Sequence, residues 1–177
     1  MNVTYDYSGY IVLVTGAASG IGLAAAQAFG RSGAHVILAD LSDDHGHHGA
    51  EAIVAQGGSA EFVHLDVASQ REVDNVVAGI VARHGKLDIA FNNAGSVGPY
   101  NPLAEVMPEE WGEALAVNLT GAFYCARESA RLMVKGGAGG SIINLSSTSA
   151  LTGEGPNHYC ASKAGIMGLT RGIAREL

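Results

Sequence analysis

Cysteine is scarce in this chain, which has two in 177 residues. Cys125 and Cys160 lie far apart in the sequence and form no C-x-x-C pair, so reduced thiols are the expected state. Residues 1–6 lack the basic and apolar regions of a signal peptide, and no apolar run reaches the length of a membrane helix. Together these absences predict a cytoplasmic protein.

Positive charge is also scarce. Ten lysines and arginines face 17 acidic residues, which gives a net charge of −7. This balance argues against a nucleic-acid partner and gives no reason to expect binding to an anionic membrane. A hydrophobic content of 47%, together with 25 glycines and no repeat or linker, fits one compact α/β domain over residues 1–177.

A glycine-rich loop is the first feature that points to a ligand. The apolar run 10–14 is typical of a strand buried on both faces, and 23–29 is rich in helix formers. Between them, a strand–turn–helix order places backbone N–H groups and a helix N-terminus where a pyrophosphate would sit. The spacing is G-x-x-x-G-x-G, and the alternative is a plain strand–helix turn. The predicted cofactor-binding residues in this loop are Gly16, Ser19, Gly20, Ile21 and Gly22.

A carboxylate ends the second apolar run. Asp40 follows His35–Ala39 and lies eighteen residues after Gly22, a placement suited to hydrogen bonds with an adenosine ribose. The same charge would repel a 2′-phosphate, and no Lys or Arg occurs between residues 15 and 31 or between 40 and 71. The sequence therefore predicts NAD rather than NADP. The alternative is that Asp40 is only a helix N-cap or a turn carboxylate.

Tyr159 and Lys163 lie four residues apart in a segment that is predicted to be helical. Residues at i and i+4 share one helix face, so the phenol and the ammonium point into the same space. A phenol is a poor acid–base group at neutral pH, and a cation held beside it stabilises the phenolate. The pair therefore predicts acid–base catalysis, whereas the motif alone would also fit an ordinary surface helix.

These motifs, with four others, resemble the short-chain dehydrogenase/reductase family, specifically its short single-domain branch. The others are Asp66-Val67, Asn92-Asn93-Ala94-Gly95 and Asn118, followed by Ile142-Ile143-Asn144-Leu145-Ser146-Ser147. All occur in the family's order over nearly the whole chain. The resemblance implies that Asp66 and Val67 contact the cofactor near its adenine. It also implies cofactor contacts at Asn93, Ala94, Gly95, Tyr159 and Lys163.

The resemblance also implies hydride transfer between NAD and a secondary alcohol or ketone. Tyr159 would exchange the proton, Lys163 would assist it and contact the ribose, and Asn118 would hold a water that links Lys163 to solvent. The serine that holds the substrate oxygen is ambiguous. The family usually places this serine thirteen residues before the tyrosine, which selects Ser146. Counted from the fifth strand, the usual position is the second serine of the pair, which selects Ser147. Rival hypotheses are a non-catalytic dinucleotide-binding protein and an epimerase or dehydratase that retains NAD.

The expected fold is a doubly wound parallel sheet of Rossmann-like α/β/α type with strand order 3-2-1-4-5-6. Five strands are predicted to start near residues 10, 34, 60, 87 and 141, and helices at 69–83, from 108 toward 134, and from 157 to the end. No sixth strand follows, so about 60 or more residues are expected to be absent, either from a fragment or from a naturally short chain. The resemblance implies a homo-oligomer, a dimer or tetramer, paired through the helices that carry Asn118 and Tyr159.

Three histidines close together in the sequence are candidate metal ligands. His45, His47 and His48 lie at the start of the second helix, where polar residues are expected, and their spacing does not match a structural zinc site. We therefore predict no metal. His158, adjacent to Tyr159, points about 100° away from it on a helix, so packing or solvent exposure is the expected role.

Overall fold

A computed structural model describes residues 4–177. Five strands form one sheet: β1 (Ile11–Thr15), β2 (His35–Asp40), β3 (Ser59–His64), β4 (Ile89–Asn92) and β5 (Ser141–Asn144). The helices are α1 (Gly20–Arg31), α2 (Asp43–Ala55), α3 (Gln70–His84), η1 (Leu103–Glu105), α4 (Pro108–Leu115), η2 (Ala116–Gly121), α5 (Ala122–Gly136), α6 (Ser149–Thr152) and α7 (Asn157–Glu176).

The sheet is parallel throughout, with strand order β3-β2-β1-β4-β5. This confirms the predicted fold class and the part of the strand order that five strands can form. The chain reverses direction across the sheet between β3 and β4, so the loops after β1 and β4 diverge at the carboxyl edge. A crevice at such a switch point is where this class of sheet binds ligands.

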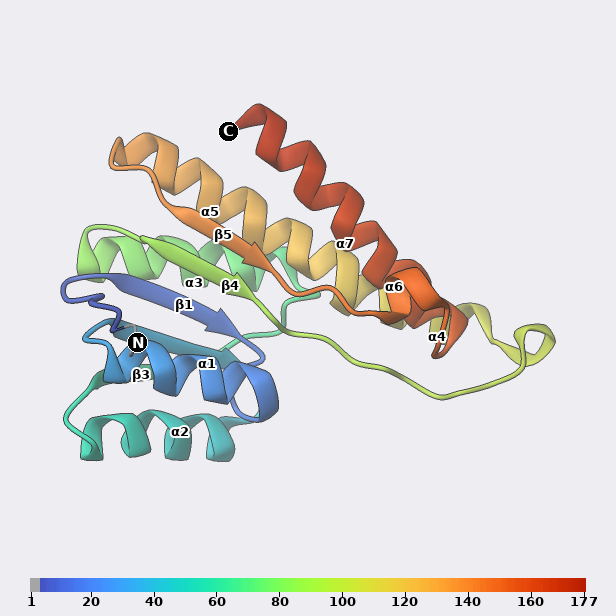
Figure 1. Cartoon of the computed structure of the whole chain (residues 1–177), viewed down its shortest axis with the longest axis horizontal. Coiled ribbons are helices and arrows are strands. Elements are labelled where there is room, and N and C mark those ends of the chain that lie inside the picture. The colour runs from blue at the N-terminus through green and yellow to red at the C-terminus, as the bar shows by residue number, and fades with distance from the viewer. Residues whose placement is uncertain (1–3) are drawn as a thin grey trace.

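Side-chain alternation along the strands creates the three layers. In β1, Ile11 and Leu13 belong to a core cluster with α3 and α5, whereas Val12 and Val14 belong to a second cluster with α1 and α2. Every residue of β1 is buried, as expected for a central parallel strand that is covered on both faces. Figure 1 shows α1 and α2 below the sheet, with α5 and α7 on the other side.

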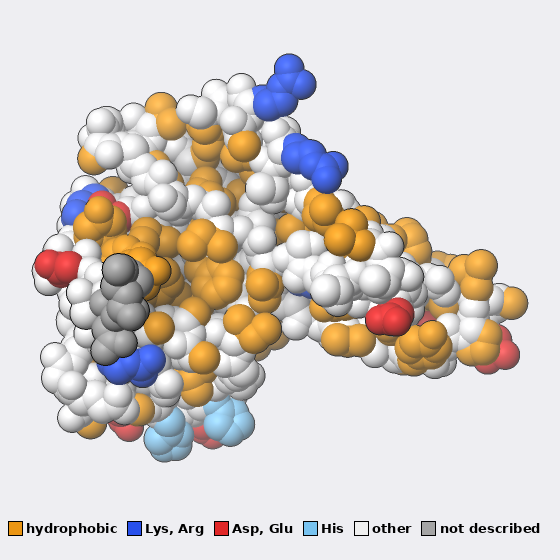
Figure 2. Space-filling model, in the orientation of Figure 1, with side chains coloured by type: hydrophobic (Ala, Val, Ile, Leu, Met, Phe, Trp, Pro, Cys, Tyr) orange, Lys and Arg blue, Asp and Glu red, His pale blue; other side chains and the backbone are white. Residues whose placement is uncertain are grey.

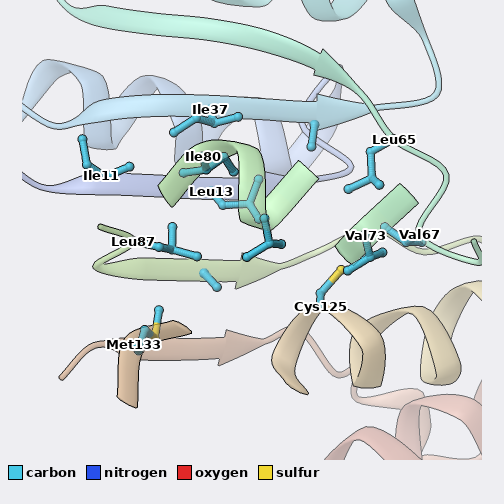
Figure 3. Packing of buried hydrophobic residues seen from close by; sticks show 13 residues of the cluster. Ile11, Leu13, Ile37, Leu65, Val67, Val73, Ile80, Leu87, Cys125 and Met133 are labelled. Carbon is cyan, nitrogen blue, oxygen red and sulfur yellow. The ribbon is translucent and has the colours of Figure 1, made fainter. Parts of the chain in front are cut away.

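The core that faces α3 is built from small and branched residues. Val73, Val77 and Ile80 of α3 are fully buried at i, i+4 and i+7, the spacing of an apolar stripe that faces a sheet. Figure 3 shows Cys125 of α5 against Val73. Burial raises the pKa of the Cys125 thiol to about 12, so this cysteine is a packing residue. Cys160 is also free, so the two cysteines form no disulfide.

The long helix expected from residue 108 is not regular. A π-helical turn, η2, lies between α4 and α5 and contains Asn118, which is buried. Asparagine is unfavourable inside an α-helix because its side chain competes for backbone hydrogen bonds. The π-helical turn replaces the regular α-helical hydrogen-bond pattern at this position. A π-bulge of this kind often marks a functional site.

The molecular surface is uneven. Residues 97–107 extend away from the body together with α4, and Figure 2 shows hydrophobic side chains gathered on this extension. Four of them, Val97, Tyr100, Leu103 and Met107, are more than half exposed. β5 is the edge strand of the described sheet, and its Ile143 is also exposed. None of the helices within residues 4–177 combines the length and apolarity needed to cross a membrane.

Candidate active site

The glycine loop between β1 and α1 is closed by close backbone packing. A Cβ placed on Gly22 would lie 2.1 Å from the Gly16 carbonyl oxygen, and a Cβ on Gly16, whose φ is +64°, would lie 2.8 Å from the Ala94 Cα. Neither position can hold a side chain without moving the loop. The two glycines therefore let β1, α1 and the segment after β4 approach one another.

Asn93 fixes that approach with its side chain. Its Nδ2 donates to the carbonyl oxygens of Thr15 and Gly16, each at 3.0 Å. The backbone N–H groups of Asn93 and Ala94 both donate to Thr15 Oγ1 at 3.1 Å. Both amide protons of Asn93 are thus used within the protein, so this residue shapes the cofactor loop. Thr15, which is buried, was missed by the sequence analysis although it ends the strand directly before the first glycine.

Asp40 lies at the carboxyl end of β2 and faces the same loop. Its Oδ2 accepts a hydrogen bond from the Ala18 N–H, and its Oδ1 accepts one from the Ser42 N–H, both at 3.0 Å. Each carboxylate oxygen has a second lone pair, so both remain able to accept a further bond. Asp40 is therefore a turn carboxylate that ties the loop after β1 to the loop after β2, and it places a negative charge at the mouth of the glycine loop. It does not cap α2, whose N-cap residue is Ser42.

The N-terminus of α1 suits an anionic ligand. Ser19 precedes the helix without making a side-chain capping bond, and the first turn of α1 contains no acidic residue. The first N–H groups of a helix have no intrahelical partner and carry partial positive charge. Gly20 has a φ of +53°, and a Cβ there would meet no atom within 4 Å, so the backbone is open to a ligand on that side. These features fit a pyrophosphate, as in other nucleotide sites.

Tyr159 and Lys163 share one face of α7. The Lys163 Nζ lies 5.8 Å from the centre of the Tyr159 ring, and it donates to the Leu145 carbonyl oxygen at 2.9 Å. Lys163 is 4% exposed and forms no ion pair with any acidic residue in the described part of the chain. Burial lowers the pKa of the Lys163 ammonium below its usual range. Its two other N–H donors remain available to a ligand.

Asn118 supports this pair from behind. Its Oδ1 accepts from the Ser96 N–H at 2.7 Å, while its Nδ2 donates to the Ser96 carbonyl oxygen and to Ser162 Oγ. Ser162, between Tyr159 and Lys163, donates in turn to the Tyr159 carbonyl oxygen at 2.8 Å. Ser162 was missed by the sequence analysis, and the only signal for it was a small polar residue inside the Tyr–Lys segment. Because both amide protons of Asn118 are used, only acceptor capacity is left for a water.

The two candidate serines differ in what they bind. Ser146 Oγ donates to the Lys163 carbonyl oxygen at 2.7 Å, which ties the loop after β5 to α7. Ser147 Oγ lies 3.1 Å from both the Oγ and the N–H of Ser149, within its own turn. The proton of Ser146 is therefore committed to the backbone of α7. The hydroxyl of Ser147 contacts only its own loop.

One cavity of about 700 Å³ unites most of these groups. It runs from the glycine loop past Asp40 to the acid–base pair. The predicted residues that line it are Gly16, Ser19, Gly20, Ile21, Asp40, Asp66, Val67, Asn93, Ala94, Gly95, Ser146, Ser147, Tyr159 and Lys163. Gly22 and Asn118 lie behind its wall, where they position the lining residues. Leu41, Leu65, Ser96, Val97, Val117 and Leu145 line the cavity too and were missed.

The four histidines that the sequence analysis considered lie outside the lining of this cavity. His45, His47 and His48 are exposed on α2, as expected, and Figure 2 shows histidine side chains at that lower face. His158 is buried, and its Cε1 lies so near Gly98 that a Cβ there would approach it to 2.9 Å. His158 thus packs beneath the extended segment that follows β4.

Comparison with known proteins gives a consistent result. A family model described as short chain dehydrogenase matches residues 10–177. Secoisolariciresinol dehydrogenase from Forsythia intermedia is 40% identical over 171 residues, which cover 96% of this chain and 61% of that protein. Short-chain dehydrogenase reductase 5 from Arabidopsis thaliana is 40% identical over 92% of this chain and 62% of its own length. The chain thus spans about three fifths of these relatives.

Solved structures agree. A short chain dehydrogenase from Mycobacterium smegmatis superposes with a TM-score of 0.93 at 33% identity, over 99% of this chain and 75% of that one. A xylitol dehydrogenase with bound NAD+ superposes with a TM-score of 0.92 at 30% identity, over 96% of this chain and 65% of that one.

Proposed function

This chain belongs to the short-chain dehydrogenase family, and we propose that its protein is an NAD-dependent oxidoreductase acting on a secondary alcohol or ketone. When bound, the nicotinamide cofactor supplies or accepts the hydride. The protein binds and orients both reactants and moves one proton. Because the chain covers about three fifths of its first relatives, the activity is proposed for the whole protein.

The observation that carries this proposal is the buried Lys163 beside Tyr159 in the cavity that also holds the glycine loop. A lysine without a carboxylate partner is costly to bury, so its retention in the wall of a cavity points to a functional role. We infer that its ammonium stabilises the Tyr159 phenolate and binds a ribose hydroxyl with its free donors. Tyr159 then exchanges a proton with the substrate oxygen.

For the substrate oxygen we favour Ser147 over Ser146. The Ser146 proton is donated to the Lys163 carbonyl oxygen, so Ser146 acts as a positioning residue for α7. Ser147 lines the same cavity, and its only hydrogen-bond partners lie in its own turn. A hydroxyl that donates to the reacting oxygen stabilises the charge that develops there. Asn118 lies behind the cavity wall and bonds to Ser96 and Ser162. Its Oδ1 can accept one more hydrogen bond, from a water that links Lys163 to solvent.

The proposed cofactor is NAD because Asp40 puts a carboxylate at the mouth of the loop, beside the α1 N-terminus. A homo-oligomer and a cytoplasmic location stay predictions, the second from the cysteine pattern. The proposed substrate class is a secondary alcohol or ketone, which fits the relatives that are named as dehydrogenases.

Substitution of Tyr159 by Phe tests the mechanism. We expect the variant to lose nearly all NADH formation from a panel of secondary alcohols, because the proton carrier is gone. NAD affinity, measured by fluorescence titration, should be unchanged, since the ring still packs. Tyr100→Phe, an exposed tyrosine outside the cavity, is the matched control. Wild-type turnover in Tyr159→Phe would remove this residue from the mechanism.

Cofactor choice is tested at Asp40. Asp40→Ser should narrow the difference between NAD and NADP affinity by removing repulsion of the 2′-phosphate. Serine keeps an oxygen that can accept the hydrogen bonds from the loop, which limits damage to the fold. Equal binding of NAD and NADP by the unmodified protein would contradict the assignment.

A further inference from the structure

A second cluster of potential ligands lies at the opposite end of the sheet. It comprises His35 at the start of β2, Glu61 within β3 and His84 at the end of α3. One ligand atom from each residue lies within 4.8 Å of the others. These residues are distant in sequence and meet only because β2 pairs with β3 in register and α3 returns across the same face.

The positions of these atoms are close to those of a metal site. Ligand atoms bound to one tetrahedral zinc ion at about 2 Å stand about 3.3 Å apart. The His84 Nε2 and the Glu61 Oε1 already lie 3.1 Å apart, and the His35 and His84 rings are separated by 4.5 Å between centres. Only a small side-chain adjustment would bring all three atoms onto a common ion.

His35 is prepared to act as a ligand. Its Nδ1 lies 2.6 Å from Ser59 Oγ, whereas its Nε2 is buried and has no hydrogen-bond partner. If Nδ1 donates its proton to Ser59, Nε2 carries a lone pair that no other group uses and that is available to an ion. A hydrogen bond that fixes the tautomer and ring orientation in this way is the usual outer contact of a metal-binding histidine.

We propose that His35, Glu61 and His84 form a binding site for a divalent zinc ion, with solvent as the fourth ligand. Two imidazoles and one carboxylate are a donor set that zinc accepts, and an open fourth position is common for such a set. The side chains of Glu61 and His84 are 34% and 20% exposed, so an ion and a water can reach the site.

One positive charge opposes this site. Arg83 Nη2 donates to Glu61 Oε1 at 2.9 Å. The Arg83 side chain is half exposed, so it can turn into solvent and release the carboxylate to the ion. This opposition makes the proposal testable. Removal of Arg83 should strengthen zinc binding, because the Glu61 carboxylate then has no competing cation. If the three residues form only ion pairs and hydrogen bonds, removal of Arg83 should not strengthen zinc binding.

The site would tie β2, β3 and α3 together far from the cofactor cavity. None of its residues lines that cavity. An ion bound only by the folded state raises its stability according to its concentration relative to the dissociation constant. The expected consequence of zinc binding is therefore greater stability of the folded protein.

The experiment is a zinc titration of the 177-residue chain by calorimetry, with cobalt substitution as a spectroscopic readout. Wild-type protein should bind one ion per chain, and cobalt should give the intense visible bands of a four-coordinate site. Ser59→Ala should weaken zinc binding by about 10–100-fold, because it removes the outer partner of His35. His35→Gln and His84→Gln each remove a ligand and should weaken zinc binding by at least as much. Arg83→Gln should bind more tightly than wild type.

Two controls separate this site from surface histidines. His64→Gln removes an exposed histidine paired with Asp43, and a triple change of His45, His47 and His48 to Gln clears α2. Both should leave the affinity unchanged, and circular dichroism checks that every variant is folded. The proposal is overturned if zinc binds the His35 and His84 variants as tightly as wild type, if the α2 variant abolishes binding, or if Arg83→Gln weakens it. Absence of any binding by wild type would overturn it too.

Discussion

The two polar clusters at opposite ends of the sheet are built differently. At the carboxyl end, Asn93 and Lys163 in the cavity wall and Asn118 behind it each bond to backbone atoms of other segments. At the amino end, Glu61 and His84 bond to side chains and are partly exposed. The first arrangement fixes positions through the main chain. The second leaves its members free to exchange partners.

This difference has an energetic consequence. A buried group whose backbone partner is lost leaves a donor or acceptor unsatisfied, which costs about 1–3 kcal/mol. A partly exposed ion pair is worth about 0–1 kcal/mol, because water replaces the missing partner. The carboxyl end should therefore tolerate little change, and the amino end should tolerate much. Three changes at the carboxyl end, taken from the largest expected effect to the smallest, test whether burial and backbone contacts are the cause of this difference.

Gly22→Ala should be the most damaging change. The new Cβ would stand 2.1 Å from the Gly16 carbonyl oxygen and 2.6 Å from Asn93 Nδ2, so the loop must open. We expect a loss of about 1–3 kcal/mol or more in the free energy of unfolding, measured by urea denaturation, together with loss of NAD binding.

The matched control is Gly172→Ala in α7. A Cβ there meets no atom within 4 Å, and the residue is exposed in a helix interior. Alanine should stabilise the protein by about 0.5–1 kcal/mol, because it reduces the freedom of the unfolded chain. If both variants changed stability equally, close packing of the loop would not be the reason for the glycine at position 22.

Lys163→Met should separate function from stability. Burial of the ammonium lowers the pKa of Lys163, so it imposes a cost that a methionine of similar shape does not. NAD affinity should fall because the proposed ribose contact is lost, whereas stability at neutral pH should change little, because relief of the desolvation cost offsets the loss of the hydrogen bond to the Leu145 carbonyl oxygen.

The pH dependence of this cost has a definite sign. Between the lowered pKa of the folded protein and the unfolded value of about 10.4, the unfolded chain binds more protons. The stability of the wild type should therefore rise with pH through this window relative to Lys163→Met, as followed by denaturation at several pH values. A constant difference between the two proteins would mean that Lys163 is not desolvated.

The sequence was sufficient for the sheet, and the structure brings most of the predicted site residues to one cavity. The strand order and parallel topology are confirmed, because apolar runs of strand length and the glycine loop are local signals. The start of β4 lies at Ile89 rather than Leu87, since Leu87 and Asp88 precede the ladder although Leu87 is buried. Such boundaries depend on pairing and not on local pattern.

What the sequence could not give are contacts between distant segments. Nothing local shows that Ser146 donates to the Lys163 carbonyl oxygen, or that Asn118 bonds Ser96, and these bonds separate lining residues from supporting ones. The π-helical turn was also missed, because it arises from the tertiary position of Asn118. His35, Glu61 and His84 were missed for the same reason, since they have no common spacing.

The smallest expected effect concerns an exposed pair at the carboxyl end, where His64 Nδ1 lies 2.7 Å from Asp43 Oδ1. The hydrogen bond with Asp43 raises the pKa of His64. Its stabilisation is therefore fully present below the unfolded value of about 6.5 and is lost as the pH rises through the folded value. The difference in Tm between wild type and His64→Gln should be small, present only on the acid side, and removed by about 1 M salt.

His48→Gln, at an exposed position on α2, provides the control and should show no such acid-side difference. The pair also isolates the cause of the contrast between the two ends of the sheet. His64 and Asp43 lie at the carboxyl end, like the cavity wall, but they are exposed and bond to each other through side chains. A large and salt-resistant effect at His64 would make position in the sheet the deciding factor. A small, screened effect leaves burial and backbone anchoring as the cause, since those are the features that this pair lacks.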